Sequence, residues 1–119
     1  MYRRKILRML KGGASPLNLA IRKWKDILYV GASDYGGKNC GLCVANTCEK
    51  CIIAEQTGLY SCNGTPYQQW VHHHQTEHAG KYPIRIRCPK CVGIVNREIK
   101  FLEDLRLKLK MKQLERPLW

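Results

Sequence analysis

The sequence has no apolar run long enough to cross a bilayer and few residues with which to build a large core. A membrane helix needs about 20 consecutive apolar residues, and no stretch approaches that length. Phenylalanine occurs once in 119 residues, and turn formers, cysteines and polar residues fill most of Gly31 to Pro83. Such a segment buries little apolar surface, so we expect cross-links or metal to stabilise it, and we expect no membrane partner.

Acidic residues are also scarce. Nine Asp and Glu stand against 21 Lys and Arg, which gives a net charge of +12. A four-thiolate zinc site would offset only about two of these charges. The excess predicts a polyanionic partner, most simply nucleic acid. The candidate contacts are basic residues near the N-terminus and beside the last cysteines, namely Arg3, Arg4, Lys5, Arg8, Lys11, Arg85 and Arg87.

No secretory leader is recognisable at the N-terminus. Residues 1–11 are basic and mildly amphipathic, and neither an apolar segment nor a small-residue cleavage site follows them. The chain nevertheless has seven cysteines, an odd number that would leave one thiol unpaired in a disulfide scaffold. We therefore expect a cytoplasmic protein, not a secreted one, with thiolates that bind metal rather than forming disulfides.

Six of the seven cysteines form Cys-x-x-Cys pairs. The cysteines are Cys40, Cys43, Cys48, Cys51, Cys62, Cys88 and Cys91. A tight turn of this spacing directs two sulfurs at one tetrahedral ion, and a second pair completes the shell. Seven cysteines and one histidine supply ligands for two sites, so we expect one or two zinc ions.

The partition of these ligands stays open. One arrangement pairs Cys40/Cys43 with Cys88/Cys91 at the start of a helix, which is a treble-clef pattern. Cys48, Cys51 and Cys62 would then bind a second ion with one histidine. Alternatively, Cys40, Cys43, Cys51 and Cys62 form a single site, and an iron–sulfur cluster is a further possibility. Of the histidines, His74 and His78 are four apart and would share a helix face, as ligands, as catalytic groups or as solvated side chains.

Hydrophobic periodicity predicts a small α-rich, zinc-stabilised domain with little β structure. Helices are expected near 16–29, 66–78 and 92–114, with a short basic helix over 2–11 and a short strand over 82–87. Ser15-Pro16 and Thr65-Pro66 read as caps followed by proline in the first turn. We expect one domain over 1–119, comprising a basic arm (1–13), a helix with a cysteine-rich metal core (14–91) and a C-terminal helix and tail (92–119).

The spacing resembles a group of small cysteine-rich proteins of phages and prokaryotic genomes. The shared pattern is a Cys-x-Leu-Cys knuckle at Cys40–Cys43, a second pair at Cys48/Cys51, Thr57-Gly58, Cys62, Thr65-Pro66-Tyr67 and Cys88-Pro-x-Cys91. The match spans most of the chain. It implies bound metal and a phage or prokaryotic origin, and it implies no particular activity.

A second, weaker resemblance is to the His-Me finger nucleases of the endonuclease VII type. It rests on His72-His73-His74 ahead of Cys88-Pro-x-Cys91 and on Asn96. It implies that one of the three histidines is a general base and that Asn96 or a nearby acid holds a divalent ion. The usual Asp-His pair is missing, because no Asp lies between Asp34 and Asp104, and Asn96 lies too far past the second cysteine.

The preferred function is therefore a zinc-binding, non-enzymatic nucleic-acid-binding module, in which Tyr67 and Trp70 are candidates for stacking on bases. One alternative is a protein-interaction factor that binds a partner or a second copy through the C-terminal helix. That helix carries one apolar line at Val95, Ile99, Leu102, Leu105 and Leu109 and another at Leu107, Met111 and Leu114. The other alternative is the metal-dependent nuclease.

Overall fold

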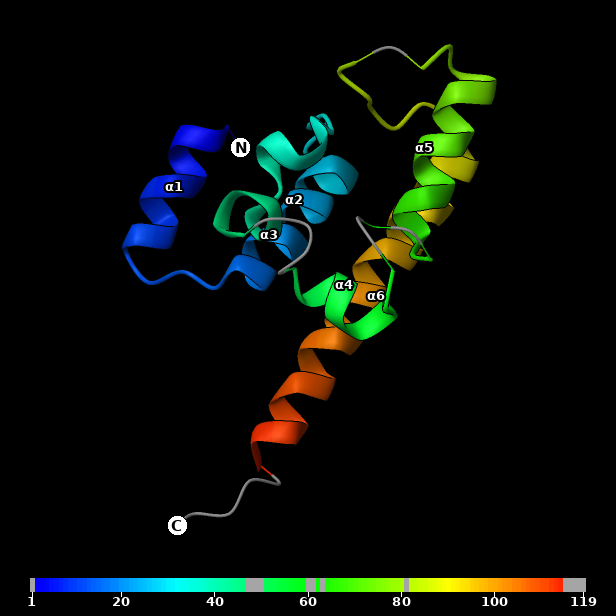
Figure 1. Cartoon of the computed structure of the whole chain (residues 1–119). Helices are drawn as coiled ribbons and strands as arrows, with labels where there is room; N and C mark the ends of the chain where they lie inside the picture. The colour runs from blue at the N-terminus through cyan, green and yellow to red at the C-terminus, as the bar shows by residue number, and fades with distance from the viewer. Residues whose placement is uncertain (1, 47–50, 60–61, 63, 81, 115–119) are drawn as a thin grey trace.

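A computed structural model of the chain describes residues 2–46, 51–59, 62, 64–80 and 82–114, and nearly all of its regular structure is helical (Figure 1). The helices are α1 (Arg3–Lys11), α2 (Pro16–Tyr29), the 3-10 turn η1 (Gly36–Asn39), α3 (Gly41–Ala45), α4 (Ile52–Thr57), α5 (Pro66–Glu77) and α6 (Pro89–Leu114). The described residues contain no strand, only an isolated antiparallel bridge between Asp34 and Ile84. The expected α-rich fold is confirmed. None of the described helices is long and apolar enough to span a membrane.

Local sequence signals fix the start of two main helices. The hydroxyl of Ser15 accepts a hydrogen bond from the backbone N–H of Asn18 (3.3 Å), and Pro16 occupies the first turn of α2. Thr65 caps α5 in the same way by accepting from the N–H of Tyr67 (3.3 Å), again with proline next. Both caps satisfy N–H groups that a helix leaves unpaired at its first turn.

The core lies where α2, α5 and α6 meet. α2 and α6 pack along their apolar faces, and α5 lies along the first half of α6 (Figure 1). Trp24 of α2 and Trp70 of α5 are buried with their rings edge to face and their centroids 5.3 Å apart. The apolar line of α6 fills the same core through Val95, Ile99, Leu102 and Leu105. The second line, at Leu107, Met111 and Leu114, is exposed.

The basic N-terminal segment is a helix packed on the rest of the chain. Ile6 is buried, and α1 contacts α3 and η1. α3 in turn lies close against α2, because a Cβ added at Gly41 would lie 2.6 Å from the Cβ of Leu19. One apolar side chain thus anchors α1 while its charged face points outward.

Asp34 is fully buried and joins three parts of the fold. One carboxylate oxygen pairs with the ammonium of Lys23 (2.7 Å) and accepts from the N–H of Gly36 (2.8 Å). The other accepts from the hydroxyl of Tyr67 and the indole N–H of Trp70, both at 3.0 Å. Burial, followed by the charge of Asp34, raises the pKa of Tyr67, so its hydroxyl stays a donor. This network ties α2 and η1 to α5.

The expected strand over 82–87 is wrong. Ile84 alone forms the bridge to Asp34, and no second strand lies beside this segment in the part of the chain that the structure describes. Three short helical segments, η1, α3 and α4, form where the composition predicts only turns. α6 begins at Pro89 rather than at 92, so Cys91 lies in its first turn.

Candidate metal centre

Two histidines at the end of α5 face two cysteines at the start of α6. His73 is buried in the last turns of α5, and His78 occupies the residue just past the end of that helix. Gly80 then adopts a positive φ of 62° and donates its N–H to the carbonyl of His74 (2.8 Å), which turns the chain back. The return segment brings Cys88 to the helix that carries the histidines.

The four ligand atoms are gathered tightly. Nε2 of His73 lies 3.1 Å from Nε2 of His78 and 3.2 Å from Sγ of Cys88. Nε2 of His78 lies 3.5 Å from Sγ of Cys88 and 3.4 Å from Sγ of Cys91. The two sulfurs are 3.4 Å apart. All four atoms lie within 4.8 Å of one another, so the group can hold a metal ion.

These separations are compatible with zinc. A tetrahedral zinc ion with Zn–S bonds of about 2.3 Å and Zn–N bonds of about 2.0 Å spaces its ligand atoms by roughly 3.3–3.8 Å. Most of the observed separations lie within a few tenths of an ångström of that range. Two imidazoles and two thiolates are also a ligand set that zinc takes in closed structural sites.

The surroundings favour the forms that coordinate metal. Backbone N–H groups in the first turn of α6, led by that of Cys91, lower the pKa of Cys88, which favours its thiolate. Desolvation lowers the pKa of His73, which favours the neutral imidazole. Desolvation raises the pKa of Cys91, so this thiol needs a cation nearby before it ionises.

A carboxylate lies behind the first histidine. Nδ1 of His73 is buried without a hydrogen-bond acceptor, and the nearest carboxylate oxygen, Oε2 of Glu77, lies 3.4 Å away. Glu77 also pairs with Lys90 across the site (3.6 Å). A carboxylate behind a ligating imidazole fixes the tautomer that presents Nε2 to the metal.

The remaining two histidines have other positions. His74 is buried, with Nδ1 2.9 Å from the carbonyl oxygen of Trp70 and Nε2 3.0 Å from that of Arg85. It therefore holds the return segment against α5, and its Nε2 is 3.7 Å from Sγ of Cys91. His72 is exposed on the outer face. Of the three histidines in the nuclease resemblance, His72 is thus the only solvent-facing one.

Neither the pairing of Cys40/Cys43 with Cys88/Cys91 nor a treble clef is confirmed. Cys88 and Cys91 meet His73 and His78 because α5 lies against the start of α6. Cys40, Cys43 and Cys62 line a different cavity, and Cys51 is buried just before α4. Cys48 lies outside the described residues.

The sequence contains the signal for this site, a His-x4-His unit followed by Cys-x-x-Cys. The i, i+4 spacing of a helix instead predicts that His74 and His78 share one face. It fails because α5 ends at Glu77, so His78 leaves the helical path and reaches the same side as His73.

The described fold and site define a helical protein with a His₂Cys₂ group that can hold a metal ion. No protein-family model, curated protein or solved structure matches the chain.

Proposed function

We propose that this chain is a zinc-stabilised protein that binds single-stranded nucleic acid without catalysis. The observation that carries the proposal is a groove of about 570 Å³ that is lined by both basic and aromatic side chains. Its lining includes Arg3, Lys38, Tyr35 and Tyr82. Aromatic rings that stack on bases, beside cations that follow the phosphates, are the recurring elements of single-strand binding.

The basic helix beside the groove supplies further charge. The five basic residues of α1 (Arg3, Arg4, Lys5, Arg8 and Lys11) are exposed, and α1 contains no acidic residue. Within the described residues, none of them forms an ion pair with a carboxylate. Their charge is therefore available to an external polyanion.

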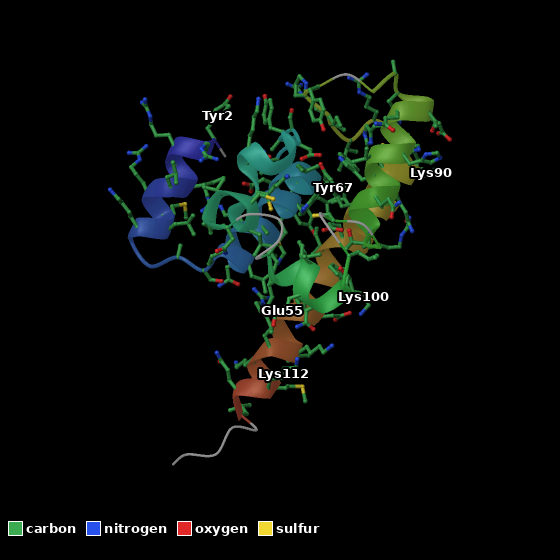
Figure 2. All side chains as sticks on the ribbon, viewed as in Figure 1. Tyr2, Glu55, Tyr67, Lys90, Lys100 and Lys112 are labelled. Atoms are coloured by element: carbon green, nitrogen blue, oxygen red, sulfur yellow. The ribbon has the colours of Figure 1, made fainter. Side chains whose placement is uncertain are left out.

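Aromatic rings are exposed on the same face. Tyr2 lies exposed at the start of α1 (Figure 2). Its ring centroid is 6.3 Å from that of Tyr35, whose ring is also exposed. Tyr82 is exposed as well. The rings expected to stack on bases are not available for it, because Trp70 is fully buried and the hydroxyl of Tyr67 is bound to Asp34.

The two arginines expected beside the last cysteines, Arg85 and Arg87, are exposed on the return segment and are not part of the groove lining. Nε of Arg85 donates to the hydroxyl of Ser33 (3.1 Å).

The test is a salt titration of the zinc-loaded protein against labelled single-stranded DNA and RNA, read by fluorescence anisotropy. We expect the double variant Arg3→Gln/Lys38→Gln to reduce the slope of log K against log salt by about 1–2, because two phosphate contacts are lost. Tyr82→Ala is expected to weaken binding by about 1–3 kcal/mol and to leave the slope unchanged, since stacking releases no counterions.

Lys100→Gln is the matched control, because Lys100 is an exposed lysine of α6 paired with Asp104. It should bind like the parent. The proposal would be contradicted if the affinity for the labelled strand did not depend on salt, or if the control and the groove variants lost equal affinity. Cleavage of the strand on denaturing gels with Mg²⁺ would favour the nuclease alternative, and a preference for one nucleic acid would identify the ligand.

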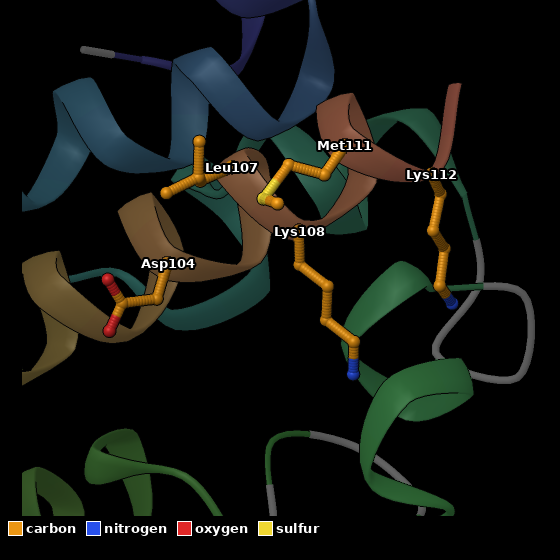
Figure 3. A pocket seen from close by; sticks show the side chains of 5 residues that line it. All are labelled: Asp104, Leu107, Lys108, Met111 and Lys112. Carbon is orange, nitrogen blue, oxygen red and sulfur yellow. The ribbon is translucent and has the colours of Figure 1, made fainter. Parts of the chain in front are cut away.

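A second candidate function is binding of an acidic amphipathic helix at the end of α6. Leu107, Met111 and Leu114 follow one another at helical spacing and are 57%, 53% and 78% exposed. Leu107 and Met111 line a shallow hollow with Lys108, Lys112 and one acidic residue, Asp104, and these side chains are labelled in Figure 3. Lysines flanking an apolar stripe complement acidic residues and disfavour a second copy of this basic chain.

This candidate predicts a monomer in sedimentation, and binding of an acidic, leucine-bearing helical peptide that Leu107→Ser/Met111→Ser weakens at least about tenfold. Leu59→Ser, at an exposed leucine that is not part of α6, is the control. Self-association, or peptide binding that the double variant leaves unchanged, would rule out this partner.

A further inference from the structure

A second group of metal-ligand side chains surrounds a cavity of about 290 Å³ between α2, η1, α3 and α6. Cys40, Cys43 and Cys62 line it, and Glu98 enters it from α6. The thiols come from two places in the chain, the Cys40/Cys43 pair at the start of α3 and the segment before α5 that carries Cys62. None of the three belongs to the His₂Cys₂ group.

Glu98 is the unusual member of this group. Its side chain is only 2% exposed, and its Oε2 has no hydrogen-bond partner among the described residues. A buried carboxyl oxygen without a partner is costly unless a proton or a cation occupies the site it faces.

The nearest cation is already engaged elsewhere. Lys23 lines the same cavity, but its ammonium is 2.7 Å from Asp34 and also donates to the carbonyl of Gly36 (3.0 Å). Lys23 therefore offsets the charge of Asp34, and ionised thiols and a carboxylate in this cavity would need another positive charge.

The backbone leaves room for the thiols. A Cβ at Gly37 would lie 3.3 Å from Cβ and 3.5 Å from Sγ of Cys43, so only glycine permits this approach without a shift. Close backbone approach of this kind is typical of cysteine knuckles that hold metal.

We infer that this cavity is a second zinc site in which Cys40, Cys43 and Cys62 supply three thiolates and Glu98 supplies the fourth ligand. Three thiolates and a carboxylate are donors that zinc accepts in tetrahedral geometry. The site is independent of the His₂Cys₂ group, and its ion would fasten α3 and the Cys62 segment to α6.

The test is the zinc content of the full chain, expressed with zinc and analysed by elemental mass spectrometry. We expect two ions per chain in the parent and one in Cys62→Ser, with helicity retained. Glu98→Gln should keep both ions but hold one at least about tenfold more weakly in competition with a chelator. Cys91→Ser removes the other ion and is the matched control for the first site.

Cobalt titration of the unsubstituted chain tests the same inference without relying on a variant's folding. We expect cobalt to bind in two steps. The sulfur-to-cobalt absorption of the two sites should stand in the ratio two to three, because the His₂Cys₂ site has two thiolates and the second site has three. The second site would be overturned if the parent chain held only one zinc ion and Cys62→Ser kept it. Iron with acid-labile sulfide, found instead of the second zinc ion, would overturn it as well. If Cys51→Ser lost the second ion while Glu98→Gln bound it with unchanged affinity, the assignment of Glu98 as the fourth ligand would be overturned.

Discussion

Cys91→Ser is expected to release the zinc ion that we propose for the His₂Cys₂ group and to destabilise the packing of α5 on α6. Cys91 is fully buried, and its sulfur lies 3.4 Å from both Sγ of Cys88 and Nε2 of His78. A structural zinc ion contributes its binding free energy to folding, an apparent 10–16 kcal/mol or so in isolated zinc-finger peptides. Losing one of four ligands should reduce zinc affinity by more than about 100-fold.

The measurement is thermal unfolding by circular dichroism, together with zinc affinity in chelator competition. A loss of about 3–4 kcal/mol corresponds to a fall in Tm of roughly 15 °C for a chain of this size. EDTA treatment of the parent should cause a similar fall, which zinc reverses. Part of the core, where α2 packs on α6, does not depend on this ion, so some helicity should survive.

His72→Ala provides the matched control, because His72 precedes His73 on α5 but is exposed. Its Tm and zinc content should stay within error of the parent. If Cys91→Ser retained zinc and stability, or if His72→Ala lost them, the assignment of ligands would be wrong.

Asp34→Asn is expected to cost about 3–5 kcal/mol of unfolding free energy, the loss typical of breaking a buried ion pair. The substitution leaves the buried ammonium of Lys23 without its counter-charge. The amide NH₂ would also replace an acceptor that serves donors such as Tyr67 and Trp70. Because Asp34 bonds to both α2 and α5, the loss should affect the whole cooperative unit.

The measurement is urea denaturation, with Asp104→Asn as the exposed control. Asp104 pairs with Lys100 2.9 Å away at the surface, and such pairs contribute only about 0–1 kcal/mol. The double variant Lys23→Met/Asp34→Asn should recover part of the loss, since no unpaired charge stays buried. Equal effects in Asp34→Asn and the control would contradict this role for Asp34.

Helices could be predicted from the sequence because their signals are local. Ser15-Pro16 and Thr65-Pro66 supply both a capping acceptor and a fixed first-turn φ, and the structure starts α2 and α5 there. The apolar periodicity of α6 was also readable from the sequence, and the structure buries most of one apolar line and exposes the other, at Leu107, Met111 and Leu114. These features depend on a few neighbouring residues and on helical periodicity.

The short helices η1, α3 and α4 could not be predicted in the same way. They are four to six residues long, too short to be stable in isolation, and so depend on packing. Leu42 of α3 and Ile53 of α4 are buried in the core that α2 and α6 build. The few apolar residues of this region are too widely spaced and too close to glycines and cysteines to give a helical period.

The sequence by itself determined that the chain is helical, basic and rich in metal-ligand side chains, because each property follows from composition or local periodicity. Only the tertiary structure decided which ligands meet. Cys88 and Cys91 join His73 and His78 because α5 ends one residue before His78 and packs along α6, while Cys40, Cys43 and Cys62 converge on another cavity. Ligand spacing predicts that two sulfurs can share an ion, but long-range packing selects the side chains that complete its shell.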